Sequence, residues 1–307
     1  MIIRTVLGDI LPSELGVTTC HEHLLWSVPE PYTDDDPDLG FDSIPAAVAE
    51  LRYFKAAGGS ALVEMTTAEI GRSPCELRQI SQAAGVHVIA VSGHHKEKFS
   101  ARAVVGKSVQ AMAAHIVKEI QEGVDSSGIR AGVIKAATSA NGASESERRV
   151  IQAVGIAHWE TGAPVSTHTE AGTFAVEQAG MLLESGVRPE KLLIGHLDRG
   201  LPTETYLKLA QMGVYLGFDQ VGKVKYWPDS ERVELVKLLI EAGYARQVLL
   251  SCDTARKSTW HVHNPRVEGL AHLLVKFVPA LRQSGVSETD IETILSTNPA
   301  RFLAFEG

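Results

Sequence analysis

The chain has 307 residues, 44% of them hydrophobic, and a net charge of −8. This acidic balance argues against nucleic acid as a partner, because a protein that binds phosphate backbones needs a basic surface. No apolar run is long enough to span a bilayer, and the first residues lack the apolar core of a signal peptide. We therefore expect a soluble, cytoplasmic protein with no membrane partner, and the three cysteines, which form no disulfide framework, fit that compartment.

The length alone would allow two domains, but barrels of repeated strand and helix reach this size as one domain. No linker rich in Pro, Gly or Ser divides the sequence. We therefore expect residues 1–307 to form a single domain.

Short apolar runs suited to strands alternate with amphipathic stretches along the chain. The first expected strand ends at His21–His23, and the later ones cover 60–66, 86–92, 130–135, 163–168, 191–196, 213–219 and 247–253. The expected helices cover 43–57, 73–84, 108–124, 144–161, 173–185, 203–212, 231–242, 267–281 with an interruption at Pro279, and 287–303.

Eight strand-then-helix units with nearly continuous apolar strands predict a parallel sheet covered by helices. Eight is also the number that closes a barrel, so we expect an α/β fold of the (β/α)8 TIM-barrel type, with a short N-terminal extension and an extra C-terminal helix. The alternative, an open doubly wound sheet, would place a Gly-rich phosphate loop after its first strand. His21, Glu22 and His23 stand there instead, which favours the barrel.

The pair His21 and His23 is the first candidate for metal binding. Side chains alternate along a strand, so these two imidazoles point the same way while Glu22 points opposite. Two imidazoles on one face are half of a metal site.

Further potential ligands stand at the ends of later strands. In a barrel these ends meet at one rim, which is where active sites of this fold lie. Imidazole and carboxylate together suit zinc, manganese, cobalt or iron better than calcium. The residues that we expect at this rim, besides the first pair, are Lys135, His168, His196 and Asp253.

Several motifs together resemble the phosphotriesterase family of the amidohydrolase superfamily, almost from end to end. They are 4–8 (RTVLG), 12–16 (PSELG), 21–23 (HEH), 166–169 (STHT), 194–196 (IGH) and 298–303 (NPARFL). The resemblance implies a barrel with two divalent metal ions, zinc first, with manganese, cobalt or iron as alternatives. It implies that one ion is held by His21, His23 and Asp253, the other by His168 and His196, and that Lys135, carboxylated on its amine, bridges both.

Such a centre implies hydrolysis of an ester-like bond. A hydroxide bridging two metals is a nucleophile at neutral pH, and one metal polarises the substrate oxygen. Asp253 is the expected catalytic residue, since it can accept the proton of the hydroxide during attack and return it to the leaving group.

Two departures from the pattern of the organophosphate hydrolases bear on the substrate. Gln220 stands where those enzymes place a His of a proton relay, and Arg199 stands where the second relay carboxylate would be. These changes argue against efficient triester hydrolysis.

The loops after the last strands are basic and resemble those of the family's lactonases for phosphorylated sugars. By that resemblance Lys223 and Arg256 bind the substrate phosphate and should act alike, while Lys225 and His95 are further candidates for substrate contact. We expect a lactonase for a small anionic lactone. The alternatives are a triester hydrolase, an amidohydrolase and a binding protein without turnover, and a homodimer is possible.

Overall fold

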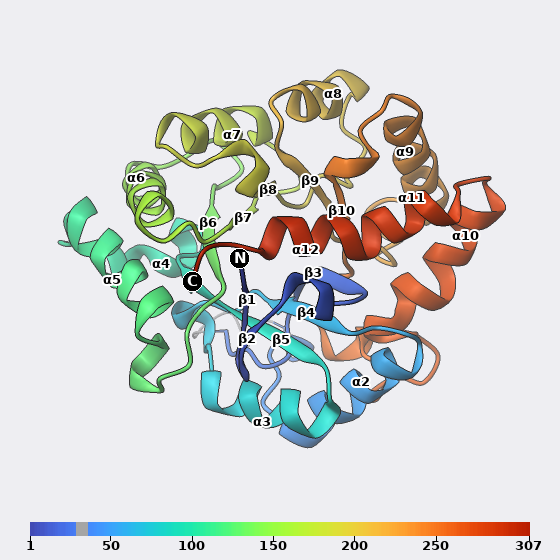
Figure 1. The fold of residues 1–307 in the computed structure, drawn as a ribbon, viewed down its shortest axis with the longest axis horizontal. Helices are drawn as coiled ribbons and strands as arrows, with labels where there is room; N and C mark the ends of the chain where they lie inside the picture. Colours follow the sequence, from blue (N-terminus) through green and yellow to red (C-terminus); the bar gives the residue numbers. More distant parts are fainter. Residues whose placement is uncertain (29–35) are drawn as a thin grey trace.

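The computed structural model describes residues 1–28 and 36–307. Its main sheet has eight strands, each parallel to the next and arranged in chain order, as the alternating pattern predicted. Helices surround this sheet, which confirms the α/β barrel (Figure 1). The strands are β3 (Thr18–Glu22), β4 (Ala61–Glu64), β5 (His87–Gly93), β6 (Val133–Ala137), β7 (Val165–His168), β8 (Leu192–Ile194), β9 (Tyr215–Phe218) and β10 (Val248–Leu250).

Side chains join the first and last strands of this order, β3 and β10. The backbone N–H of His21 donates to Ser251 Oγ at 2.8 Å. The Glu22 carboxylate accepts from the backbone N–H groups of Cys252, at 2.8 Å, and Thr254, at 3.0 Å. Glu22 thus points away from the two histidines, as strand alternation predicted, and closes the barrel beside them.

Apart from α4 (Glu97–Val104), which was not expected, and α10 (Val278–Gln283), which begins at Val278 and not near 267, the helices begin within two residues of the expected starts. Ser43, Ser108 and Ser144 cap three of them, each accepting a backbone N–H through its side chain, which explains why these helices start where they do. The helices are α2 (Ile44–Ala56), α3 (Pro74–Ala84), α4 (Glu97–Val104), α5 (Val109–Gln121), α6 (Glu145–Thr161), α7 (Ala175–Glu184), α8 (Thr203–Gln211), α9 (Asp229–Glu241) and α10 (Val278–Gln283).

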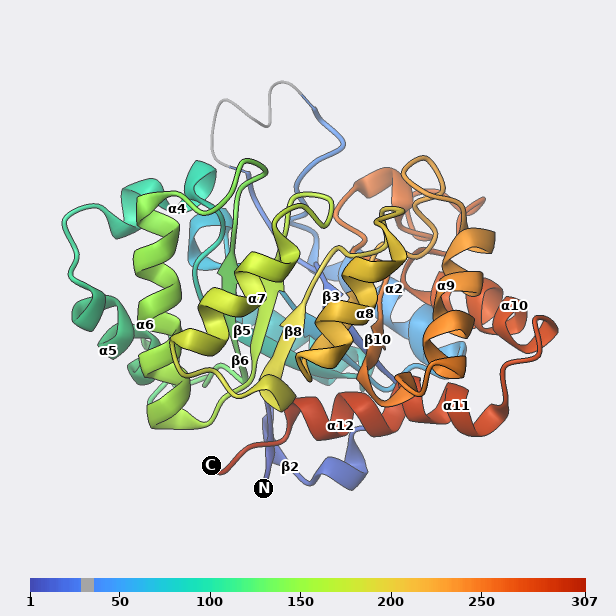
Figure 2. The same ribbon diagram turned by 90° about the horizontal axis from the view of Figure 1, so that it is seen from above.

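Both ends of the chain lie at one end of the barrel (Figure 2). The N-terminal extension is an antiparallel hairpin of β1 (Ile3–Thr5) and β2 (Gly8–Ile10). The extra C-terminal helical stretch consists of α11 (Glu288–Glu292), a π-helical turn and α12 (Asn298–Leu303), and it crosses the same end. The expected interruption near Pro279 is a π-helical turn, Leu273–Phe277, which lies just before that proline.

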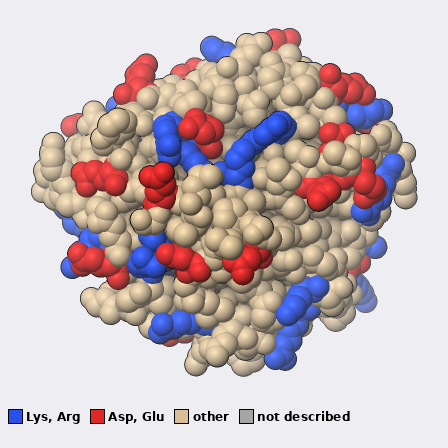
Figure 3. Space-filling view, in the orientation of Figure 1, with Lys and Arg blue, Asp and Glu red and all other residues tan. Residues whose placement is uncertain are grey.

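The core has an inner part enclosed by the strands and an outer part between strands and helices. Ile89, Val91, Val133 and Leu249 belong to the inner cluster and are at most 1% exposed. At the face that carries the termini, acidic and basic side chains are interspersed (Figure 3). Among the described residues, no helix combines the length and the apolar character that crossing a bilayer requires.

Candidate metal centre and anion pocket

The expected ligands gather at the opposite end of the barrel and are all buried, between 1% and 7% exposed apart from His168, which is partly buried. His168 is the last residue of β7, while His196 and Asp253 follow β8 and β10. Both of these have a left-handed backbone, with φ of 59° and 47°. A non-glycine residue in this region stores strain, and such residues cluster at functional sites.

Lys135 does not end its strand, which corrects the sequence-based expectation. It is the third residue of β6 and pairs with Gly93, the last residue of β5. A Cβ at residue 93 would lie 2.2 Å from the Lys135 carbonyl oxygen, so only glycine allows the two backbones to approach this closely. Lys135 still reaches the rim because its side chain is long.

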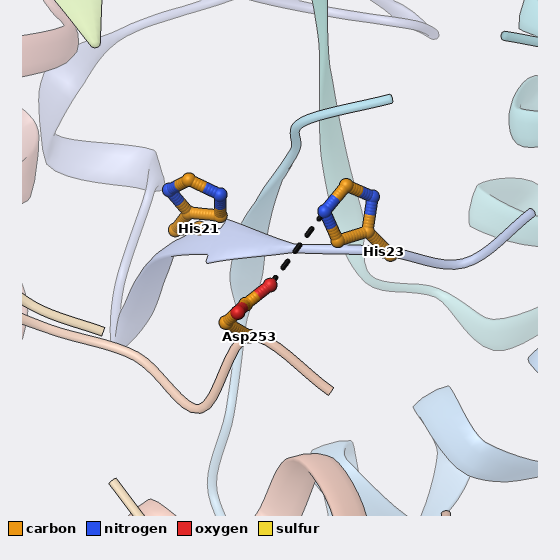
Figure 4. A group of neighbouring side chains, drawn as sticks. All are labelled: His21, His23 and Asp253. Carbon is orange, nitrogen blue, oxygen red and sulfur yellow. Dashed lines mark ion pairs between the residues drawn. The ribbon is translucent and has the colours of Figure 1, made fainter. Parts of the chain in front are cut away.

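A hydroxyl fixes the ring of His23. Thr66 Oγ1 donates its single proton to Glu64 Oε1 at 2.6 Å, so it can only accept from His23 Nδ1, which lies 2.8 Å away. His23 therefore carries its proton on Nδ1 and has a lone pair on Nε2. That nitrogen lies 3.6 Å from Asp253 Oδ1 (Figure 4).

Carboxylates orient the rings of His168 and His196. Asp219 Oδ1 lies 2.6 Å from His196 Nδ1, and Glu170 Oε1 lies 3.1 Å from His168 Nε2. The remaining ring nitrogens, His196 Nε2 and His168 Nδ1, face each other at 2.8 Å. These two nitrogens lie close enough together to serve one metal ion.

His21 lies between the two groups. Its ligand atoms come within 4.8 Å of those of His23 and Asp253, and also of those of His196 and Asp219. Burial, the first cause, lowers the pKa of His23 to about 3 and that of His21 and His168 well below the usual value. These rings are therefore neutral at pH 7, which is the form that binds metal ions.

Lys135 is only 1% exposed, which excludes a surface role. Its Nζ donates to the Met65 carbonyl at 2.7 Å. Burial lowers its pKa to about 8, although Asp253 and Glu64 act in the opposite direction. At this pKa a minor fraction of the amine is neutral at pH 7, and the neutral amine is the form that can react with carbon dioxide. The residues present thus fit a divalent metal site with a carboxylated lysine.

The two oxygens of Asp253 have different neighbours. Oδ1 faces His23, while Oδ2 accepts from Lys223 Nζ at 2.5 Å and from Gln220 Nε2 at 3.5 Å. Burial raises the pKa of Asp253, but the charge of Lys223 and the neighbouring histidines outweigh this effect and lower it to about 2. Asp253 is therefore ionised at neutral pH.

Gln220 and Arg199, which stand at the positions of the proton relay described above, form a chain of hydrogen-bond donors that ends at Asp253. Arg199 Nε donates to Gln220 Oε1, which fixes the amide so that its NH2 group faces Asp253. The Arg199 guanidinium lies 3.8 Å from the centre of the Tyr226 ring. Neither an amide nor a guanidinium gives up a proton at neutral pH, so this chain orients Asp253 without conducting protons.

The rim encloses a cavity of about 630 Å³, a size that suits a small molecule. Its lining includes the metal-ligand candidates and all four residues predicted to contact substrate, which are His95, Lys223, Lys225 and Arg256. Arg256 forms an ion pair with Asp36 and lies 3.7 Å from Asp38. Lys223 instead pairs with Asp253, so the two cations do not have equivalent surroundings.

Sequence reasoning missed several residues that hold the ligands. Asp219 directly follows β9 and Glu170 lies two residues after the end of β7, so their positions carried a signal that could have been used. Thr66 gave no such signal, because it fell within an expected strand, where a threonine is usually a packing residue. Lys96 also lines the cavity and pairs with Glu170.

The fold and the site define an α/β-barrel protein whose histidines and carboxylates suit metal binding. The chain belongs to the phosphotriesterase family, whose model matches residues 1–303.

Known relatives cover nearly the whole chain. The phosphotriesterase homology protein of Escherichia coli is 32% identical over 94% of this chain and 97% of its own, and it has been solved with phosphate in its active site, at a TM-score of 0.90. The phospho-furanose lactonase of Mycoplasmopsis synoviae is 34% identical, with 99% and 92% covered. A lactonase structure from Listeria monocytogenes matches at 30% identity and a TM-score of 0.93, with both chains fully covered.

An N-acetyltaurine hydrolase of Danio rerio is also similar, at 30% identity, with 99% of this chain and 98% of the relative covered. These relatives are hydrolases, so the chain is a hydrolytic enzyme.

Proposed function

We propose that the protein holds two divalent metal ions, zinc first, and hydrolyses a small lactone that carries an anionic group, most simply the phosphate of a phosphorylated sugar. One observation carries this proposal. The set of ligand candidates and three cationic side chains, Lys223, Lys225 and Arg256, line the same cavity.

Within this proposal His21, His23 and Asp253 would hold one ion, His168 and His196 would hold the other, and Lys135, once carboxylated, would be shared by both. When bound, two such ions supply an activated water as nucleophile and polarise the substrate carbonyl. Thr66, Asp219 and Glu170 contribute by presenting the free ring nitrogens toward common points.

Asp253 moves the proton. Its Oδ1 lies on the side of His23, and its Oδ2 is held by Lys223 and Gln220. The carboxylate can accept the proton of the attacking water and return it to the alkoxide that leaves when the lactone ring opens. Because the neighbouring amide and guanidinium conduct no proton onward, the proton stays available for this return. A lactone needs that step, since an alkoxide is a poor leaving group unless it is protonated.

Arg256 and Lys223 recognise the anion. They follow adjacent strands, β10 and β9, and line the same cavity. Arg256 can form two parallel hydrogen bonds to a phosphate. Lys225 is exposed at the mouth, where its charge attracts an anion from solution, and His95 lines the wall beside His168, with ring centres 4.8 Å apart. The similarity to a phospho-furanose lactonase supports this assignment.

A panel of substrates tests the proposal. It compares lactones that differ only in a phosphate ester, a phosphotriester and an N-acyl amine, each with metal-loaded protein, and it measures kcat/KM. We expect the phosphorylated lactone to be hydrolysed at least tenfold more efficiently than its neutral counterpart, which corresponds to about 1.4 kcal/mol. Equal rates on both lactones, or faster cleavage of the triester, would contradict it.

The same panel of substrates tests a second candidate function, hydrolysis of an amide. The similarity to an N-acetyltaurine hydrolase favours cleavage of an amide that carries an anionic group, which the same cations could bind. Release of free amine without lactone hydrolysis would establish that activity instead.

A further inference from the structure

Asp219 occupies a position between the two groups of candidate ligands. It follows β9 directly and is 2% exposed. Its Oδ1 lies 2.6 Å from His196 Nδ1, and both of its oxygens accept from the His196 backbone N–H, at 3.0 and 3.1 Å. Its Oδ2 lies 3.4 Å from His21 Nδ1.

The nitrogen that faces Asp219 Oδ2, His21 Nδ1, has no other polar partner in the described part of the chain. His21 is 2% exposed, and its Nδ1 has no hydrogen-bond partner among the residues that the structure describes. A buried polar group left unpaired costs about 1–3 kcal/mol, so native structures rarely leave one without a purpose. Asp219 Oδ2 is the carboxylate oxygen that faces it, and a small rotation of the ring would complete the bond.

The backbone around Asp219 makes room for this double contact. A Cβ at residue 195 would lie 2.9 Å from Asp219 Oδ2 and 2.3 Å from the Thr167 carbonyl oxygen. Gly195 therefore permits the carboxylate to come close to both rings. The same carboxylate holds the left-handed turn at His196, whose φ is 59°.

We propose that Asp219 is a positioning residue shared by both metal ions. It accepts the Nδ1–H of His196 with one oxygen and the Nδ1–H of His21 with the other, so that both rings present Nε2 as the ligand atom. This inference rests on the proposed two-metal centre. It separates Asp219 from Thr66, which contacts only His23, and from Glu170, which contacts only His168 among the candidate ligands.

The consequence is that the two metal sites depend on one side chain. Carboxylates that hold the second nitrogen of a ligating histidine typically change metal affinity by about 10–100-fold. Asp219→Asn keeps the shape but replaces one acceptor oxygen with an NH2 group, which cannot accept an N–H. An amide at residue 219 that has lost its hydrogen bond to one ring can also move away from the other ring. We therefore expect weaker metal binding at both sites.

The test measures metal affinity, not turnover. Wild type, Asp219→Asn and Thr66→Val are freed of metal, titrated with Co²⁺ in competition with a chelator, and followed by the cobalt absorption bands and by metal content. We expect Asp219→Asn to weaken both binding steps by at least tenfold and Thr66→Val to weaken only one. Thermal unfolding of the chelated proteins shows whether each variant folds.

Asp219→Glu gives an independent route, because it displaces the carboxylate from both rings without removing its charge or either acceptor oxygen. It should weaken both steps in the same direction as Asp219→Asn, and it decides the matter if Asp219→Asn does not fold. The inference would be overturned if a folded Asp219→Asn protein bound Co²⁺ in both steps with wild-type affinity, or if only one step were weakened. If wild type itself binds fewer than two ions, the proposed function fails instead.

Discussion

Asp253 is the residue on which the proposed reaction depends most, because in that proposal its carboxylate would both hold a metal ion and carry the proton. We expect Asp253→Asn to lower kcat far more than it raises KM, since an amide cannot accept the proton in the transition state. Steady-state kinetics on the best lactone measure this, with metal content determined for both proteins. Unchanged turnover at equal metal content would remove Asp253 from its role.

Arg256 and Lys223 should differ when each is replaced by alanine, although their positions in the sequence suggested equal roles. Arg256 pairs with partly buried carboxylates that are not candidate ligands, so Arg256→Ala should affect only anionic substrates. A charge-assisted hydrogen bond is worth about 1.5–3 kcal/mol, which predicts a loss of about tenfold to a hundredfold in kcat/KM on phosphorylated lactones. Neutral lactones should be hydrolysed nearly as before.

Lys223 also holds Asp253 Oδ2 at 2.5 Å. We therefore expect Lys223→Ala to slow hydrolysis of both neutral and phosphorylated lactones, and the same kinetic comparison measures it. A loss equal to that of Arg256→Ala, and confined to phosphorylated substrates, would show that the contact with Asp253 has no effect on catalysis.

The candidate ligands could be predicted from the sequence because each is a histidine, lysine or aspartate at or near the end of a strand. The contacts that orient them could not. The pairing of Lys223 with Asp253 depends on the path of the loop after β9, and the role of Thr66 depends on the single proton of its hydroxyl. Neither leaves a pattern in the sequence.

At the scale of elements, a buried ion pair connects α5 to the barrel. Arg72 Nη1 donates to Glu119 Oε2 at 2.9 Å and to the Val91 carbonyl at 2.8 Å, and Ser92 Oγ donates to the same carboxylate at 2.6 Å. Burial raises the pKa of Glu119, but His115 and Arg72 outweigh it and lower the pKa to about 2.

The lowered pKa of Glu119 predicts how the free energy of unfolding depends on pH. A carboxyl group whose pKa is lowered on folding stabilises the protein fully above its unfolded pKa of about 4.5, and the contribution is lost as the pH falls toward 2. We expect Glu119→Gln to lower the free energy of unfolding at pH 7 by about 3–5 kcal/mol, because it leaves Arg72 without its main counter-charge. It should also flatten the dependence of stability on pH between 4.5 and 2.

Denaturant unfolding at several pH values measures both effects. The double variant Arg72→Met, Glu119→Gln is the control, and it should recover part of the lost stability because the charge that then lacks its partner, that of Asp125, is exposed to solvent. A single variant as stable as wild type at pH 7 would contradict the assigned role of the pair.

Most strands and helices of the barrel could be predicted because their apolar periodicity is strong. The elements that were missed are short or polar. Helix α4 starts after Lys96 with no side-chain cap, and the strands of the β1–β2 hairpin have only three residues each. Such segments are defined by their tertiary contacts, for example the bonds of Ile2 with Phe305, which no local pattern reveals.

At the scale of the whole molecule, the candidate ligands come from strands on different sides of the barrel, β3, β6, β7, β8 and β10. Metal ions bound among them would tie these strands together in the folded state only. Binding at 100 times the dissociation constant stabilises a protein by about 2.7 kcal/mol. We expect a chelator to lower the Tm by several degrees and zinc to restore it, as measured by calorimetry.

Lys135→Met is the matched control for this prediction. It keeps the length and apolar part of a buried side chain and removes the proposed bridge, so zinc should raise its Tm much less. A wild-type Tm that does not respond to chelator or zinc would contradict metal binding in the barrel.

The barrel and the family could be recognised from the sequence, because eight repeated units and a set of motifs extend over the whole chain. The nature of the substrate could not be read in the same way. It depends on how the basic loops after β9 and β10 fold over the cavity, and the structure shows that Arg256 and Lys223 have different partners there.

The most direct test of the central claim is anomalous X-ray diffraction from crystals of the zinc-loaded protein grown with bicarbonate. We predict two zinc peaks per chain, one beside His21, His23 and Asp253 and one beside His168 and His196, with density for a carboxylate on Lys135 Nζ between them. A single peak, or two peaks with an unmodified Lys135, would contradict the account.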